Sequence, residues 1–261
     1  MKEFFSNCKK YWNFCCYSAR CQLNVEIVGM RLGWLWWLLE PALNMAIYTY
    51  VFTVVFGRKM DYLMAFIACG VMMWGFFQRT VLGSVGLVKR YTGLLNRVYM
   101  PKYILIISNI MLNAIKMFIA FLIVVYFIVF YYKIPLSFTM LQLIPVVAVL
   151  MVYTFAISIW MMHLGVYLPD LRKVCGVVLQ VCFYASGVFY SIGDRLEGVM
   201  ATIMLDMNPV AWLMQEARNV LIYGLNCSVE GLCRWLIVGV VVAFAGIKTV
   251  THCEKNYLKV I

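Results

Sequence analysis

An apolar stretch near the start of this chain constrains its fold more than any other feature. Residues 32–56 read LGWLWWLLEPALNMAIYTYVFTVVF and contain a single charge, Glu40, directly before Pro41. About 20 apolar residues in a helix cross the roughly 30 Å hydrocarbon core of a bilayer. Comparable stretches recur along the chain, of which 65% is hydrophobic and 13% charged, with a mean hydropathy of +0.88. This composition excludes a soluble globular domain and predicts an integral membrane protein.

The apolar stretches predict an all-α fold with six transmembrane helices. These spans cover residues 33–56, 62–88, 104–131, 141–168, 172–190 and 231–249. An even number of spans places both termini on one side of the membrane. Lys and Arg are concentrated on that side, in residues 1–32, 89–103, 169–173 and 248–261. By the positive-inside rule this side is the cytoplasm. Anionic lipid then accounts for the formal charge of +11, and no nucleic-acid partner is expected.

The N-terminal residues predict an amphipathic helix at the cytoplasmic interface. Apolar side chains from Phe4 to Ile27 recur with the spacing of one helical face, whereas Lys9, Lys10 and Arg20 fall on the other face. Such a helix anchors a protein at the interface or packs against a cytoplasmic partner. The predicted units are therefore this N-terminal helix, a transmembrane domain and a cytoplasmic tail, over residues 1–32, 33–250 and 251–261.

Two short segments on the predicted cytoplasmic side differ from the spans. Residues 89–102 read KRYTGLLNRVYMPK, a basic segment with Pro101 near its end, and predict a short helix across the membrane face. Residues 168–174 read LPDLRKV, where Asp170 suits the N-cap of the next helix. Both patterns are also typical of ordinary basic loops and helix caps, so spacing alone assigns them no function.

The predicted external segment, residues 191–230, is too apolar for a loop exposed to water. Asn208 followed by Pro209 predicts a helix start, and Tyr223 followed by Gly224 predicts its end. A second apolar piece lies near residues 199–207. We expect two re-entrant helices here, because irregular backbone at membrane depth must be surrounded by protein or water. The segment also carries four carboxylates, on Asp194, Glu197, Asp206 and Glu216.

Patterns for catalysis and metal binding are weak. His163 and His252 lie far apart, with no carboxylate at ligand spacing. The chain has no G-x-x-x-x-G-K-[ST] loop with which to hold ATP. We therefore expect no metal, no cofactor and no enzymatic activity in this chain. Among ten cysteines, Cys227 and Cys233 lie outside and could form a disulfide. Charges within spans are costly and usually face protein or water; here they are Glu40, Arg79 and Lys116.

Six short sequence segments follow one another in a characteristic order: LGWLWWLLEP, TVVFG, LLNRVYMPK, YLPDLRKV, SGVFYSI and NPVAWLMQEARNVLIYG. Together with the N-terminal helix, this order resembles the permease subunit of type-2 ABC exporters. Within that group it is most similar to exporters of bacterial O-antigen, capsular polysaccharide or teichoic acid. The match covers nearly the whole chain. It departs from the family in SGVFYSI, where a Pro commonly follows the Ser, and in its ten cysteines.

The resemblance implies a channel-forming permease that moves a lipid-linked polysaccharide across the bacterial plasma membrane. Six spans are half the usual set around such a channel, which implies a homodimer or a heterodimer with a sister permease. ATP and Mg would be bound by two copies of a separate ATPase subunit. The expected partners are therefore that ATPase, a second permease chain, the lipid-linked glycan and membrane lipid.

The resemblance also implies roles for particular residues. Residues 90–100 would form the coupling helix beside the N-terminal helix, and the coupling residues would be Arg90, Asn96, Arg97, Tyr99 and Asp170. Aromatic surfaces along which sugar rings slide would come from Trp34, Trp36, Trp37, Tyr48, Tyr50, Trp74, Phe76 and Phe77. The outer gate would be formed by Asn208, Pro209, Glu216, Arg218 and Gly224. Each aromatic residue is also typical of a lipid-facing belt.

Two other classes of protein fit the sequence less well. A membrane-embedded transferase acting on lipid-linked sugars needs clustered carboxylates or His at the interface. Asp170 is the only acidic residue between Glu40 and the C-terminal tail on the expected cytoplasmic side. A secondary transporter would show broken spans in two related halves, and the chain has no visible internal repeat. The sequence therefore favours the permease.

Overall fold

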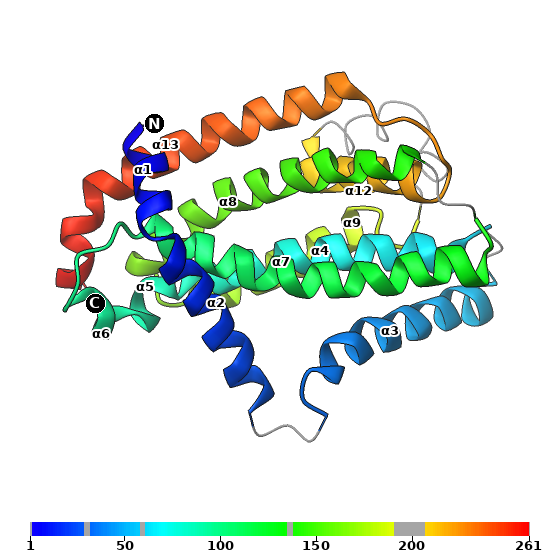
Figure 1. Cartoon of the computed structure of the whole chain (residues 1–261), viewed down its shortest axis with the longest axis horizontal. Coiled ribbons are helices and arrows are strands. Elements are labelled where there is room, and N and C mark those ends of the chain that lie inside the picture. Colours follow the sequence, from blue (N-terminus) through cyan, green and yellow to red (C-terminus); the bar gives the residue numbers. More distant parts are fainter. Residues whose placement is uncertain (1, 29–31, 58–60, 135–137, 191–206, 261) are drawn as a thin grey trace.

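The computed structural model describes residues 2–28, 32–57, 61–134, 138–190 and 207–260, and every regular element within these ranges is a helix. The four longest run lengthwise through one bundle (Figure 1): α4 (Leu63–Val85), α7 (Tyr103–Tyr126), α8 (Leu143–Tyr167) and α13 (Val229–Val260). The predicted all-α fold is confirmed. Both ends of the chain lie at one end of the bundle, here called the terminal end, and the opposite end is called the far end.

Shorter helices surround the bundle. At the terminal end lie α1 (Lys2–Lys10), α2 (Trp12–Ile27), α5 (Leu87–Arg90) and α6 (Thr92–Leu95). Two helices end in a π-helical turn, α3 (Leu35–Tyr50) in η1 (Val51–Val55) and α7 in η2 (Phe127–Tyr131). The remaining helices are η3 (Phe138–Gln142), α9 (Leu171–Ala185) and α12 (Pro209–Leu221).

Five helices in the described chain are long and apolar enough to cross a membrane. They cover Leu35–Val55, Leu63–Val85, Tyr103–Tyr131, Phe138–Tyr167 and Val229–Glu254, and they coincide with five of the six predicted spans. The predicted span over residues 172–190 differs, because α9 has only 15 residues and is about 22 Å long. Helix length alone therefore leaves the count of six unconfirmed. Helix α13 continues through the residues of the predicted cytoplasmic tail to Val260.

The centre of the bundle is α4, whose side chains are mostly buried between α3, α7, α8, α9 and α12. Gly165 on α8 lies against the end of α4, and a Cβ at this position would overlap the carbonyl oxygen of Val85. Small residues of this kind let two helices approach closely without any water-driven collapse. In contrast, the residues of α3 are exposed or half-buried on the single chain, with Met45 as the one buried residue of this helix.

Polar side chains join α4 to α7 inside the bundle. Asn109 donates from Nδ2 to the Thr80 carbonyl oxygen at 2.9 Å and to Ser84 Oγ at 3.2 Å. Asn113 donates in turn to the backbone oxygen of Asn109 at 3.0 Å. All four side chains are buried. Hydrogen bonds between helices hold such a pair together where apolar burial gives no preference over lipid.

The predicted N-terminal helix over residues 4–27 is interrupted at Tyr11, which separates α1 from α2. Helix α2 packs along α7 and buries Cys15, Ser18 and Ala19. At its end, Glu26 forms an ion pair with Lys116 of α7 at 2.5 Å. One of the three predicted charges within spans therefore has a partner on the N-terminal helix, whereas Glu40 and Arg79 are exposed on this chain.

Candidate functional site

The segment predicted to couple to an ATPase lies at the terminal end, but it is not a single helix. The structure has two short helices, α5 and α6, separated by Tyr91 and followed by an irregular stretch that reaches Pro101. The predicted helix over residues 90–100 is therefore wrong in detail. The segment still presents an accessible surface, because four of the predicted coupling residues are exposed: Arg90, Asn96, Arg97 and Tyr99.

Tyr99 connects this segment to two other elements. Its hydroxyl donates to Glu254 Oε1 of α13 at 2.6 Å, and its carbonyl oxygen accepts from the Tyr11 hydroxyl at 3.2 Å. The ammonium of the buried Lys102 lies 5.4 Å from the centre of its ring. The hydrogen bond to Glu254 raises the pKa of Tyr99 to about 12. Tyr99 is thus held in place from the N-terminal helices and from the end of the last helix.

The last turns of α13 are built into the terminal end of the bundle. Glu254 is 6% exposed, and Val250 and Tyr257 are fully buried. The Tyr257 hydroxyl lies 2.5 Å from Nδ1 of His163 on α8. Glu254 therefore links the predicted coupling segment, residues 87–101, to α13, and Tyr257 links α13 to α8. These links could not be predicted from the sequence, since a stretch rich in charge at a chain end is also typical of a solvated tail.

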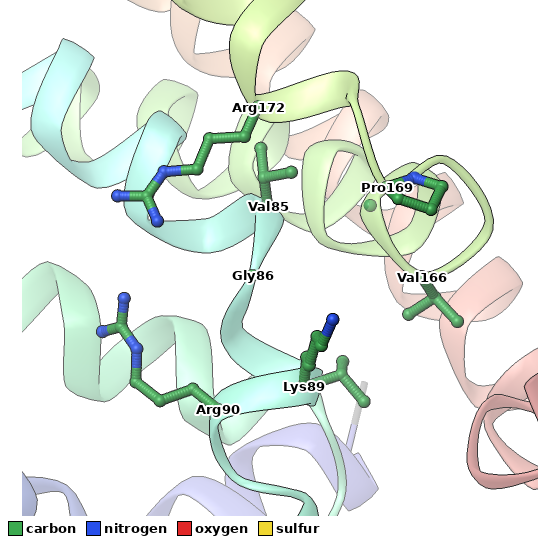
Figure 2. Close-up of a pocket in the computed structure, with 9 residues that line it drawn as sticks. Val85, Gly86, Lys89, Arg90, Val166, Pro169 and Arg172 are labelled. Atoms are coloured by element: carbon green, nitrogen blue, oxygen red, sulfur yellow. The ribbon is translucent and has the colours of Figure 1, made fainter. Parts of the chain in front are cut away.

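A basic cavity of about 460 Å³ lies between the ends of α4 and α8 and the start of α9 (Figure 2). Lys89, Arg90 and Arg172 contribute side chains to its lining. Asp170 stands at the N-cap position of α9, but its side chain makes no capping hydrogen bond, so the predicted cap is wrong. It instead lies 3.7 Å from Lys173, and both side chains are exposed to solvent.

The aromatic residues predicted to line a channel separate into two groups. Trp34, Trp36 and Tyr50 are exposed on the single chain, and Trp37 is half-buried, all on α3 or just before it. The others face the core: half-buried Tyr48 packs 4.8 Å from Phe189, and buried Trp74 packs 5.5 Å from Phe77, between ring centres. Phe76 is also buried. The buried aromatic residues contribute to the core of this chain, and a sugar-binding role for either group stays a prediction.

At the far end, α12 begins where the sequence predicts and ends two residues before the predicted end at Tyr223. Asn208 accepts hydrogen bonds at Oδ1 from the backbone nitrogens of Val210 at 3.1 Å and Ala211 at 3.2 Å, and Pro209 occupies the first helical position. Gly224 adopts a φ of 65°, which favours glycine. The predicted helix is confirmed, although it ends at Leu221. The predicted piece at residues 199–207 falls outside the described residues except for Met207, and Asp194, Glu197 and Asp206 also lie outside them.

Arg218 fixes α12 to its neighbours. Its side chain is 2% exposed and donates to three carbonyl oxygens, those of Phe66 at 3.2 Å, Gly187 at 3.0 Å and Val188 at 2.9 Å. The guanidinium carbon also lies 3.5 Å from the centre of the Phe66 ring, a distance typical of a cation–π contact. A buried arginine thus joins α12 to α4 and to the turn after α9.

Two further contacts attach the ends of α12. Asn208 donates from Nδ2 to Ser186 Oγ at 2.7 Å, which places the start of α12 against the end of α9. Glu216 Oε2 accepts a hydrogen bond from the backbone nitrogen of Ser228 at 2.9 Å, which attaches α12 to the start of α13. All five residues predicted for the outer gate therefore lie on or beside one helix that is held on three sides.

Within the described residues, no group of three His, Cys, Asp or Glu side chains could hold a metal ion. His163 on α8 and His252 on α13 both lie toward the terminal end of the bundle. Among the described residues, only His163 has a hydrogen-bond partner, the Tyr257 hydroxyl. All ten cysteines are free thiols. The disulfide that Cys227 and Cys233 could form is therefore not present in this structure.

Comparison with known proteins gives relatives over most of the chain. The O-antigen export system permease protein RfbA of Myxococcus xanthus is 25% identical over 225 residues, which is 86% of each chain. RfbA of Klebsiella pneumoniae is 20% identical over 92% of this chain and 91% of its own. The polysialic acid transport protein KpsM of Escherichia coli is 22% identical over 78% of this chain and 79% of its own. No protein-family model matches the chain.

These relatives confirm the resemblance to type-2 ABC permeases. The match extends over most of the chain and therefore includes both ends of the bundle rather than one motif.

Proposed function

We propose that this chain is the channel-forming permease subunit of an ATP-driven exporter that moves a lipid-linked polysaccharide across the bacterial plasma membrane. The similarity to O-antigen export permeases over 86–92% of the chain carries this proposal. The chain would act as a transport subunit, with ATP and Mg bound by two copies of a separate ATPase. A second permease chain would complete the channel.

In this proposal the terminal end of the bundle faces the cytoplasm. It carries the exposed cations of the coupling segment and of the α8–α9 connection, as the positive-inside rule requires. Both chain ends would then be cytoplasmic, and α12 would lie at the external face. The units proposed from the sequence follow the same order: an N-terminal interface helix, a transmembrane domain and a cytoplasmic end.

The fifth crossing would be completed by α9 together with the turn that follows it. Helix α9 starts beside Val85, where Arg172 and Val85 line one cavity, and the turn after it reaches Phe66 through Arg218. Between Val85 and Phe66, α4 covers about 28 Å at 1.5 Å per residue. That length approaches the hydrocarbon core of a bilayer. Six crossings are therefore compatible with a fifth helix that is itself too short.

The outer closure would be formed by α12 as the ascending limb of a re-entrant pair. Its start contacts Ser186 at the end of α9, inside the bundle, and its end lies near Gly224 at the far end. Most of α12 is buried, including Ala211, Met214 and Val220, whereas Gln215 and Asn219 are half-buried. A helix with this burial closes the external end of the chain rather than lying in water.

The ATPase would bind at the exposed part of the coupling segment. Asn96 and Arg97 are exposed beyond α6, and the neighbouring Tyr99 is held by α13 and the N-terminal helices. A displacement of this segment would therefore act directly on three elements. Arg90 and Asp170 lie in the same region, on either side of the basic cavity.

Charge reversal at Arg97 tests this assignment. In the complex co-expressed with its ATPase, Arg97→Glu should reduce recovery of the ATPase on the tagged permease and reduce export, because it disturbs a complementary charged surface. The matched control is Lys133→Glu, an exposed cation at the opposite end of the bundle, which should leave recovery unchanged. Equal recovery and export in Arg97→Glu and wild type would contradict the docking site. ATP hydrolysis by the homogeneous permease alone would contradict the transport-subunit assignment itself.

A further inference from the structure

An apolar cavity of about 420 Å³ lies between the N-terminal helix α1 and three of the long helices, α7, α8 and α13. Its walls come from residues 107–111, 151–155 and 240–247, and each of these ranges lies within a helix that is long and apolar enough to cross a membrane. Along α13 the lining extends from Val240 to Ile247, which is about 10 Å at 1.5 Å per residue. The cavity is therefore elongated along the bundle and lies in the part of the chain that a bilayer surrounds.

Two aromatic side chains of α1 cover this cavity at the terminal end. Phe4 packs 5.2 Å from Tyr103, at the start of α7, and 6.1 Å from Phe155 of α8, between ring centres. Phe5 packs edge-on against Phe4 at 5.6 Å, and its side chain is exposed at the rim of the cavity. Phe244 of α13 is also exposed at this rim. The cavity is therefore covered at the terminal end and open at the exposed surface of α13.

Every side chain that lines the cavity is an aliphatic group, an aromatic ring or a methionine thioether. A water molecule in a cavity needs about two to four polar partners, and these side chains offer none. A saccharide or a lipid headgroup would lose its hydrogen bonds there for the same reason. Met111 and Met151 are unbranched and adapt to the shape of a flexible ligand. The lining therefore selects an uncharged, flexible hydrocarbon.

The bilayer itself supplies a ligand of this kind. Since the cavity opens between helices that can cross a membrane, the hydrocarbon chains of lipids reach it without leaving the membrane core. Its long direction follows α13, and lipid chains extend in the same direction across each leaflet. A hydrocarbon chain in the cavity also gives the lining side chains dispersion contacts on the side that faces the space. The volume of about 420 Å³ lies within the range of roughly 300–1,000 Å³ that is typical of ligand pockets.

We propose that the cavity between α1, α7, α8 and α13 binds one hydrocarbon chain of a membrane lipid, irrespective of the lipid headgroup. The bound chain contacts Phe4 of α1 and Ala243 of α13 at the same time. It thereby holds the N-terminal helix to α13, whose last turns carry Glu254, the hydrogen-bond partner of Tyr99. The inference depends on insertion of the chain in a membrane and not on the proposed export.

The test is native mass spectrometry of the purified full chain, which counts the lipids bound to each protein molecule. The detergent is glyco-diosgenin, because its rigid steroid body has no flexible alkyl chain that would itself fill the cavity. The long-chain probes are dioleoylglycerol, which has no phosphate, and dioleoyl phosphatidylcholine. Dihexanoyl phosphatidylcholine carries the same headgroup on short chains.

Two matched substitutions in α13 distinguish the cavity from the outer surface. Ala243→Phe fills the cavity, since Ala243 lines it and is 8% exposed. Ala245→Phe makes the same change on the same helix, at an exposed position that does not line the cavity. Ala243→Leu adds a smaller side chain at the first position and serves if the phenylalanine variant does not elute as a single folded species.

We expect the first dioleoylglycerol and the first dioleoyl phosphatidylcholine to bind with affinities within about two-fold of each other, because both bury the same chain. Dihexanoyl phosphatidylcholine should bind about ten-fold more weakly or less, since it buries fewer methylene groups. Ala243→Phe should weaken the first binding of both long-chain lipids about ten-fold, Ala243→Leu should weaken it about three-fold, and Ala245→Phe should change it less than about two-fold. Dioleoylglycerol should also raise the thermal unfolding midpoint of the wild type but not that of Ala243→Phe.

Three results would overturn the proposal. Equal binding of the first lipid in Ala243→Phe and Ala245→Phe would show that lipids bind the outer surface and not the cavity. Equal binding of dihexanoyl and dioleoyl phosphatidylcholine would show recognition of the headgroup instead of the chain. Loss of a dimer in Ala243→Phe, with lipid binding unchanged, would show that a second copy of this chain occupies the cavity. Since none of these measurements involves transport, each result is independent of the proposed function.

Discussion

The contact between Gly70 and Arg218 predicts opposite effects for two matched substitutions in α4. A Cβ at Gly70 would overlap Nη2 of Arg218 and would lie 3.2 Å from both the carbonyl oxygen and Cγ1 of Val188. The guanidinium has no free space to move into, because three carbonyl oxygens and the Phe66 ring surround it. Gly70→Ala must therefore displace Nη2 and break at least its hydrogen bond to Val188.

The magnitude follows from that bond. A hydrogen bond from a charged group contributes about 1.5–3 kcal/mol, and alanine in place of glycine within a helix returns about 0.5–1 kcal/mol. We expect Gly70→Ala to lower the free energy of unfolding by about 1–2 kcal/mol. Gly75→Ala is the matched control on the same helix, since the nearest atom to its Cβ would belong to the Arg79 guanidinium, at 3.4 Å. It should raise the free energy of unfolding by about 0.5–1 kcal/mol.

Both variants are purified in one detergent, and their unfolding is followed by tryptophan fluorescence against increasing denaturant. A second readout is the reactivity of a single cysteine at Ala211, which should rise in Gly70→Ala as α12 loosens from α4. If Gly70→Ala proves as stable as Gly75→Ala and leaves the cysteine protected, the guanidinium moves without cost and the reasoning is refuted.

Three further contacts lead to measurable outcomes. An unfolded tyrosine ionises near pH 10, whereas Tyr99 keeps its proton up to a pKa of about 12. Its hydrogen bond to Glu254 should therefore stabilise the fold fully below pH 10, and this stabilisation should be lost between pH 10 and about 12. Tyr99→Phe should abolish that alkaline loss of stability in denaturation curves. The same dependence of the unfolding free energy on pH in Tyr99→Phe and wild type would contradict the prediction. In a background without native thiols, single cysteines at Ala211, Met214 and Val220 should resist an impermeant external reagent more than those at Gln215 and Asn219, and uniform labelling would indicate an ordinary loop. A double-mutant cycle of Glu26→Gln and Lys116→Gln should give a coupling of about 1 kcal/mol, since the pair is partly exposed, and a coupling near zero would show that it does not hold α2 to α7.

The sequence predicted those elements whose signals are local. The lengths of the apolar stretches predicted five of the spans to within a few residues. An apolar segment of that length can cross a membrane only as a helix, because every backbone polar group must be hydrogen-bonded within the segment. Asn208 and Pro209 gave the start of α12, since their side-chain oxygen and fixed φ act on the next three residues alone. In both cases the residues that specify the structure lie within the element they specify.

The sequence could not predict features that depend on contacts between distant residues. The length of α9 was overestimated, because the apolar residues 186–190 continue the span in composition but form a turn that supplies carbonyl oxygens to Arg218. The local sequence places Glu254 in a solvated tail, because its hydrogen-bond partner Tyr99 is 155 residues away in the chain. Asp170 fitted a cap by type and position, yet its carboxylate lies beside Lys173 instead of the backbone nitrogens.

The meeting of α9 and α12 has a consequence for how the far end opens. The last carbonyl groups of α9 carry the negative end of one helix dipole, and the first backbone nitrogens of α12 carry the positive end of another. Ser186 and Asn208 join these two ends by one hydrogen bond of 2.7 Å. Separating the helices would leave the Asn208 amide hydrogen without its acceptor in an apolar surrounding, at a cost of several kcal/mol. Water must therefore enter this point as α12 leaves it, so that opening and hydration of the far end occur as a single event.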